Sequence, residues 1–151
     1  MDTIDITLDE LLIEINKSID EKILGTNFLE LLKYKLIEKF NDLEKNKLNK
    51  LKLMPIDGKN LEKEIELERR KINYRIEYFD KSVSQIKKKM DNNYLWIILK
   101  GLKNITVYDF KNNEKYIFSK LSKNMGIVLS LNTVITTKIS EKSIILSISS
   151  S

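Results

Sequence analysis

The sequence predicts an α+β protein, with helices in its first half and an antiparallel β-sandwich in its second half. In the first half of the 151-residue chain, apolar residues recur every three or four positions. From residue 72 the apolar period changes to two, which is the period of a half-buried strand. We therefore expect a helical segment at residues 1–71 and a β domain at residues 72–151, joined in one structural unit.

Two amphipathic helices are predicted near the N-terminus. The first covers residues 8–19, and Thr7 is placed to cap it. The second begins near Thr26 or Asn27 and extends to about Leu51. One stripe of this helix is strongly apolar, and its members are Phe28, Leu32, Leu36, Phe40 and Leu43.

Turn residues end the second helix and precede a third, shorter one. Pro55 lacks a backbone donor, and the pair Asp57-Gly58 favours a tight turn, so we expect a loop at residues 54–59. The third helix is predicted near residues 61–70, where Arg69 and Arg70 suit a helix C-terminus.

Eight strands are predicted after this point, because short apolar runs alternate with turn residues rich in Asn, Asp and Gly. The spacers are too short for crossover helices, so the strands should pair antiparallel in a sandwich or small barrel. The predicted ranges are 72–79, 82–87, 94–100, 104–110, 115–121, 126–131, 134–139 and 143–149.

The composition excludes several kinds of chemistry. The chain has no histidine and no cysteine, so it has no imidazole base, no thiolate nucleophile and no disulfide. The 27 basic and 22 acidic side chains give a net charge of +5 with mixed signs, which is typical of a well-solvated surface. We find no signal peptide and no apolar run that would span a membrane, and we expect a cytoplasmic protein.

Four segments of the second half resemble the cupin superfamily, whose members are small jelly rolls that enclose a pocket. YLWIILKG at 94–101 resembles the strand and closing glycine of the first cupin motif, and ITVYD at 105–109 resembles the strand after it. The segment at 122–133 resembles the later glycine, strand and turn, and residues 143–148 resemble the closing strand. The resemblance covers roughly residues 72–149 and implies a jelly roll.

The sequence departs from the cupin pattern at the metal ligands. Metal-binding cupins carry three histidines and a glutamate, which in this chain fall near Lys87 to Met90, on Tyr94 and near Ile135. None of these residues reproduces a set of neutral imidazoles with a carboxylate. The resemblance therefore implies a degenerate cupin, and we expect no metal and no cofactor.

Candidate ligand-binding residues lie on the predicted strands of the β domain. Tyr94 and Trp96 share one strand face, where aromatic rings serve either as pocket floor or as core. Tyr108 is a further candidate, and Lys87 belongs to a basic turn, residues 87–89, that either meets an anionic ligand or is simply solvated.

The chain also has groups able to transfer protons. Asp109 and Tyr94 are the catalytic candidates that we single out, and Asp109 alternatively ends its strand as a turn former. Other side chains able to act as acid, base or ligand contact are Tyr74, Glu77, Tyr78, Asp80, Tyr108 and Glu114.

Three functions follow as hypotheses. The first is a non-catalytic, metal-free binding or assembly protein of unknown ligand. The second is a metal-independent isomerase, lyase or epimerase acting on a small carbohydrate or acid. The third is weak binding of nucleic acid through the basic clusters at 45–52 and 69–71, whose charge is partly cancelled by neighbouring acids.

The apolar stripe of the second helix must be covered by some surface. Either the helices pack on the sheet of their own β domain, or they pair with those of a second subunit under two-fold symmetry. We expect a homodimer from this stripe.

Overall fold

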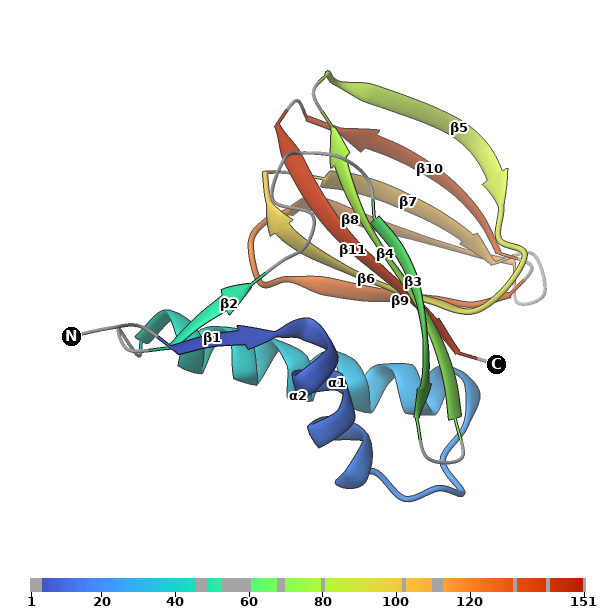
Figure 1. Cartoon of the computed structure of the whole chain (residues 1–151). Coiled ribbons are helices and arrows are strands. Elements are labelled where there is room, and N and C mark those ends of the chain that lie inside the picture. Colours follow the sequence, from blue (N-terminus) through green and yellow to red (C-terminus); the bar gives the residue numbers. More distant parts are fainter. Residues whose placement is uncertain are drawn as a thin grey trace.

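The computed structural model describes residues 4–45, 49–52, 61–67, 70–79, 81–101, 103–109, 113–131, 133–140 and 142–150. In this part of the chain there are two helices and eleven strands (Figure 1). The first elements are β1 (Ile4–Thr7), α1 (Leu8–Lys17), α2 (Gly25–Lys45), β2 (Asn49–Lys52) and β3 (Leu61–Leu67). The strands of the second half are β4 (Arg70–Phe79), β5 (Val83–Lys89), β6 (Tyr94–Lys100), β7 (Lys103–Asp109), β8 (Glu114–Leu121), β9 (Gly126–Leu129), β10 (Val134–Ile139) and β11 (Ser143–Ser150).

The eight strands β4 to β11 form a jelly roll. One sheet has the order β4-β11-β6-β9 and the other has the order β5-β10-β7-β8, and all neighbours in both sheets are antiparallel. This arrangement, in which the chain alternates between two four-stranded sheets, is that of a double Greek key. The α+β class and the cupin-like jelly roll predicted from the sequence are thus confirmed.

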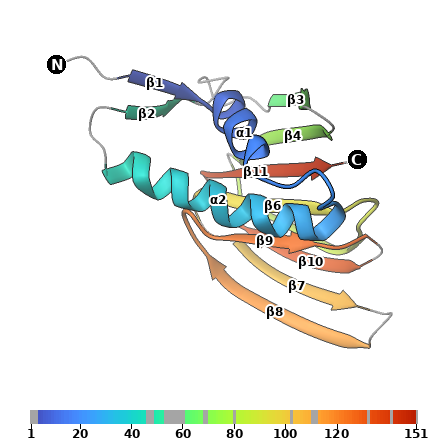
Figure 2. The same cartoon turned by 90° about the horizontal axis from the view of Figure 1, so that it is seen from below.

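The two helices cover the outer face of the larger sheet, as Figures 1 and 2 show. Helix α2 contacts β6, β9 and β11, while α1 contacts β3 and α2. The apolar stripe of α2 is buried in this layer, with Phe28, Leu29 and Leu36 fully covered. Together with residues of β4, β6 and β11 it forms one apolar core. The first of the two alternatives for the stripe therefore holds, and the stripe offers no surface to a second subunit.

Each strand of the larger sheet divides its side chains between two environments, as the period of two requires. In β4, Ile72, Tyr74 and Ile76 face the helices. In β6, Leu95 and Ile97 face the helices, whereas Trp96 and Ile98 point into the space between the sheets. The odd-numbered side chains of β4 lie on the face opposite to the helices, and from Lys71 to Glu77 they are polar, whereas Phe79 packs against a second core.

Arg70 at the start of β4 ties the helices to the sheet. Its guanidinium donates to Asn16 Oδ1 at 2.8 Å and to the carbonyl oxygens of Asp20 at 2.5 Å and Ile23 at 2.7 Å. The same group lies 4.2 Å from the centre of the Phe28 ring. Because these partners come from the end of α1, the following loop and α2, one side chain holds three segments in place.

The structure corrects two predictions of helix. Residues 61–67 form the edge strand β3, in which Ile65 pairs with Ile72 of β4, and not the start of a third helix. Its Leu and Ile spacing fits both periods, and pairing with the open edge of β4 selects the strand. Helix α2 ends at Lys45 instead of about residue 51, because residues 49–52 pair in parallel with β1 as strand β2.

The predicted strands of the jelly roll agree closely with the observed ones. Strands β6 and β10 have the predicted bounds, and the other six differ by one or two residues at one or both ends. The basic segment at 87–89 was predicted as a turn, which is wrong, since these residues continue β5, and Lys88 and Lys89 pair with β10. The predicted loop at 54–59 lies outside the described residues.

Candidate functional site

The space between the two sheets is apolar at one end and polar at the other. At the apolar end, β8, β9 and β10 contribute Leu121, Leu129 and Ile135 to a second core that includes Ile98 and Val107. At the polar end, where β4 and β5 lie, two adjoining cavities of about 130 Å³ and about 460 Å³ remain open. They share the lining residues Arg75, Glu77, Lys88, Trp96 and Ser147.

The smaller cavity reaches the corner where the chain passes from β6 to β7. Gly101 in this corner has φ +87°, and a Cβ atom on it would lie 2.9 Å from the Cα of Ser143. A side chain is therefore excluded, and the tight passage brings Lys103 to the first position of β7, beside Trp96. The remaining lining residues of the smaller cavity are Phe79, Val83, Ile139 and Ile145.

Lys103 is the most unusual ionisable group among the described residues. Its side chain is 3% exposed, and its Nζ lies 3.5 Å from the centre of the Trp96 ring. The pKa of Lys103 is lowered to about 7, mainly by burial; the carboxylate of Glu77 partly opposes this shift, and the ammonium of Lys88 contributes a smaller lowering. The neutral form of this amine is therefore accessible at neutral pH.

Trp96 forms the wall between the two cavities. Its Nε1–H donates to Ser147 Oγ at 3.0 Å, and these two residues are also paired across β6 and β11. The indole is thus held with one face against Lys103. Tyr94 lines the larger cavity, and its hydroxyl donates to Asp91 Oδ1 at 2.8 Å.

The larger cavity is lined mostly by polar side chains and meets the solvent. Asn73, Arg75 and Lys88 are exposed, whereas Met90 and Ser149 are buried. Other members of its lining are Glu64, Tyr74, Asn92 and Tyr94. Its volume lies within the range of pockets that hold small molecules.

Two of the four predicted ligand-binding residues line a cavity. These are Tyr94 and Trp96. Tyr108 alternates with the inward-facing Val107 and so lies on the outer face, where Lys115 Nζ is 5.5 Å from its ring centre. The backbone of Lys87 lies in β5, and its side chain is outside the described part of the structure; its neighbour Lys88 lines both cavities.

The two catalytic candidates are not brought together. Asp109 ends β7 opposite Glu114 and lines neither cavity, so it does not share a site with Tyr94. Among the other acid and base candidates, Glu77 lines both cavities and Asp80 lies outside the described residues.

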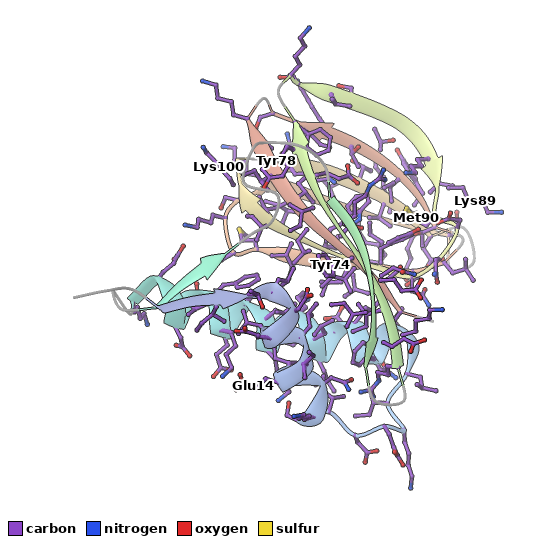
Figure 3. All side chains as sticks on the ribbon, in the orientation of Figure 1. Glu14, Tyr74, Tyr78, Lys89, Met90 and Lys100 are labelled. Carbon is purple, nitrogen blue, oxygen red and sulfur yellow. The ribbon has the colours of Figure 1, made fainter. Side chains whose placement is uncertain are left out.

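Tyr74 contributes to the lining of the larger cavity, but its hydroxyl group contacts the helices. Its hydroxyl donates to Asp9 Oδ1 at 2.6 Å, and burial together with this bond raises the pKa of Tyr74. Figure 3 labels Tyr74 where the helices meet the sheet. We therefore assign it to the packing of the helices on the sheet.

Sequence reasoning did not single out Lys103, Arg75 or Ser147. Arg75 and Ser147 occupy the polar positions of alternating strands, which usually face solvent. A helical layer on the apolar face turns those polar positions inward, and the amphipathic stripe of α2 was the signal for such a layer. Little in the sequence indicated that Lys103 is buried, because a lysine close after a glycine is ordinary in a chain with 27 basic residues.

The positions that correspond to cupin metal ligands do not form a metal site. Met90 and Ile135 are buried in the apolar second core, and Lys88 carries an ammonium group, which is not a ligand while it is protonated. In the part of the chain that the structure describes, no three carboxylates gather into a possible ligand set. These residues do not fit the iron or manganese of metal-binding cupins.

No helix within the described residues is long and apolar enough to cross a membrane. No protein-family model matches the sequence, and no curated protein matches it significantly.

Several solved structures are similar to this chain in fold. The CENP-C cupin domain of Drosophila melanogaster has 12% identity and a TM-score of 0.43, with 60% of this chain and 75% of that chain covered. A cupin superfamily protein from Desulfitobacterium hafniense has 15% identity and a TM-score of 0.41, with 64% and 82% covered. KdgF from Halomonas sp. has 12% identity and a TM-score of 0.44, with 64% and 83% covered. The strand order itself, and not these distant similarities, establishes that the chain has a cupin-like jelly-roll fold.

Proposed function

We propose that this protein binds a small organic anion in the polar end of its jelly roll, without a metal ion. The observation that carries this proposal is the pair of cavities lined by Arg75, Lys88 and Lys103 between the sheets. A sandwich that served only as a scaffold would gain stability by filling this space with apolar side chains. The open space and its basic lining support ligand binding over a purely structural role.

The charges of the cavity favour an anion. Glu77 Oε1 lies 3.5 Å from Arg75 Nη1, and Glu64 lies 2.8 Å from Lys71 Nζ, so both carboxylates that line the cavities have a basic partner. None of the ion pairs among the described residues includes Lys88 or Lys103. A carboxylate ligand would give these two amines the salt bridge that neither makes with a carboxylate among the described residues.

Binding is supported more strongly than the alternatives. The isomerase, lyase or epimerase hypothesis relied on Asp109 and Tyr94 sharing a cavity, and they do not. The nucleic-acid hypothesis is weakened because Arg70, in the basic cluster at 69–71, is only 6% exposed and bonds to the helices instead. Assembly remains the second candidate, because Tyr116 and Ile117 on the edge strand β8 are 45% and 68% exposed.

The homodimer remains a prediction, but the apolar stripe of α2 no longer supports it. Since the stripe of α2 is covered within the chain, a two-fold contact would have to use another surface, such as the edge of β8. Light scattering coupled to size-exclusion chromatography measures the mass directly, and Ile117→Lys should return a dimer to a monomer if β8 forms the contact. We also expect a cytoplasmic protein, as the sequence indicated.

A ligand screen tests the binding proposal. We would measure the melting temperature of the protein with a panel of small carboxylates, sugars and phosphates, and then measure affinity for each hit by calorimetry. The proposal expects carboxylates to bind and Lys88→Met to weaken them at least tenfold. Lys138→Met removes an equal charge from an exposed site on β10 and is the matched control. Failure of every carboxylate, or equal weakening by both variants, contradicts the proposal.

A further inference from the structure

The smaller cavity contains an arrangement that binding of an anion alone does not require. A lysine that only attracts a carboxylate works best when it stays exposed to solvent, as Lys88 is. Lys103 instead is 3% exposed, has its Nζ over the indole of Trp96 and contributes to the lining of the smaller cavity. Burial of an amine in this way makes the charged form costly and the nucleophilic neutral form accessible.

We propose that Lys103 captures a small 2-oxo acid by forming an imine with its ketone carbon, while Lys88 holds the carboxylate. This inference rests on the proposed function and names the chemical class of the ligand. Lys88 and Lys103 both line the cavity of about 130 Å³. This cavity is similar in size to one that admits benzene, so it suits a ligand of three to five carbon atoms that contacts both side chains.

The reaction needs only the ligand and the lysine. The lone pair of neutral Lys103 Nζ attacks the ketone carbon, and the electron pair of the C=O bond moves to the oxygen, which takes up a proton and gives a carbinolamine. The proton on that oxygen is the first of the two protons of the amine; the second leaves with the hydroxyl group as water, and the C=N bond forms. One amine and one ketone thus give one imine and one water, and the step is reversible by hydrolysis.

The surroundings of Lys103 suit each part of this step. The neutral amine is accessible at pH 7, because burial lowers the pKa of Lys103 to about 7. Glu77, which lines the same cavity, is the carboxylate available to accept and return protons. The chain has no cysteine or histidine, so Lys103 competes with no thiolate or imidazole for the carbonyl group.

Reductive trapping tests the inference on the intact protein. We would incubate it with pyruvate and sodium cyanoborohydride at pH 7, measure the intact mass, and locate the adduct by peptide mapping. We expect one reduced adduct per chain, on Lys103, formed more than tenfold faster than on exposed Lys138. Lys103→Met should abolish the adduct, and Lys138→Met should leave it unchanged. Labelling spread evenly over the surface lysines overturns the inference.

Two further probes separate this inference from the proposed function. Lactate has the carboxylate of pyruvate without its ketone, so it should bind reversibly and give no adduct. If lactate and pyruvate both bind in calorimetry but cyanoborohydride traps nothing, imine formation is refuted while anion binding stands. If neither binds and no adduct forms, both fail. Should Lys103→Met not fold, the mapped position of the adduct in the unsubstituted protein still decides the question.

Discussion

Replacing Lys103 by methionine should stabilise the fold and remove part of its pH dependence. The amine is buried, and its pKa falls from the ordinary 10.5 to about 7. Each tenfold change in proton affinity is worth about 1.4 kcal/mol, so protonated Lys103 lowers the free energy of unfolding by about 5 kcal/mol. This is a large share of the stability of a domain, which is typically about 5–15 kcal/mol.

The direction of the pH effect follows from the two pKa values. Below pH 7 the lysine is charged in both states, and the full penalty applies. Between about pH 7 and 10.5 only the unfolded chain keeps the proton, so the free energy of unfolding rises with pH. From pH 7 to pH 9 this group alone should add about 2 kcal/mol.

Urea unfolding at pH 6, 7, 8 and 9, followed by tryptophan fluorescence, measures this contribution. At pH 7 the methionine variant gains about 4 kcal/mol from the absent charge and loses about 1 kcal/mol of contact with Trp96, for a net gain of about 3 kcal/mol. The gain should shrink towards pH 9. Lys138→Met, at an exposed site on β10, controls for the general effect of one charge. Parallel pH profiles for the natural protein and Lys103→Met would refute the argument.

Three further substitutions test the fold that carries the site. Gly101→Ala should destabilise the protein by about 3 kcal/mol in thermal unfolding, because φ is +87° and Ser143 lies against the new methyl group; an unchanged melting temperature would contradict this. Arg70→Met should cost about 3 kcal/mol, because it removes the donor to Asn16 and two carbonyl oxygens, and faster hydrogen exchange in residues 16–24 should accompany it. Leu36→Ala should cost about 3 kcal/mol in urea unfolding, whereas Tyr34→Ala, at a 66% exposed position on the same helix, should change little.

The strand pattern of the second half could be predicted because it depends on local sequence. Alternating side chains and Asn, Asp or Gly turns give strand bounds within one or two residues, and short spacers require antiparallel pairing. Residues 61–67 were predicted wrongly because their apolar spacing fits a helix as well as a strand. There the edge of β4, a feature of the assembled sheet, decides the outcome.

The site could be predicted only in part, because the direction of its side chains depends on how the sheets and helices assemble. Tyr94 and Trp96 were identified because aromatic residues on one strand face indicate a pocket or a core. Arg75 and Lys103 were not, because their inward direction depends on which face of the sheet the helices cover and on the corner at Gly101. A single sequence gives the period of a strand but does not say which of its faces lies inside.

The two faces of β4 also bear on how a new specificity could arise in this protein. Ile72, Tyr74 and Ile76 anchor the helical layer, whereas Arg75 and Glu77 line the cavities without entering that core. A substitution at an odd-numbered position changes the chemistry offered to a ligand and leaves the helix–sheet contact intact. Evolution, or a protein engineer, can therefore explore new ligands along this strand with little risk to folding.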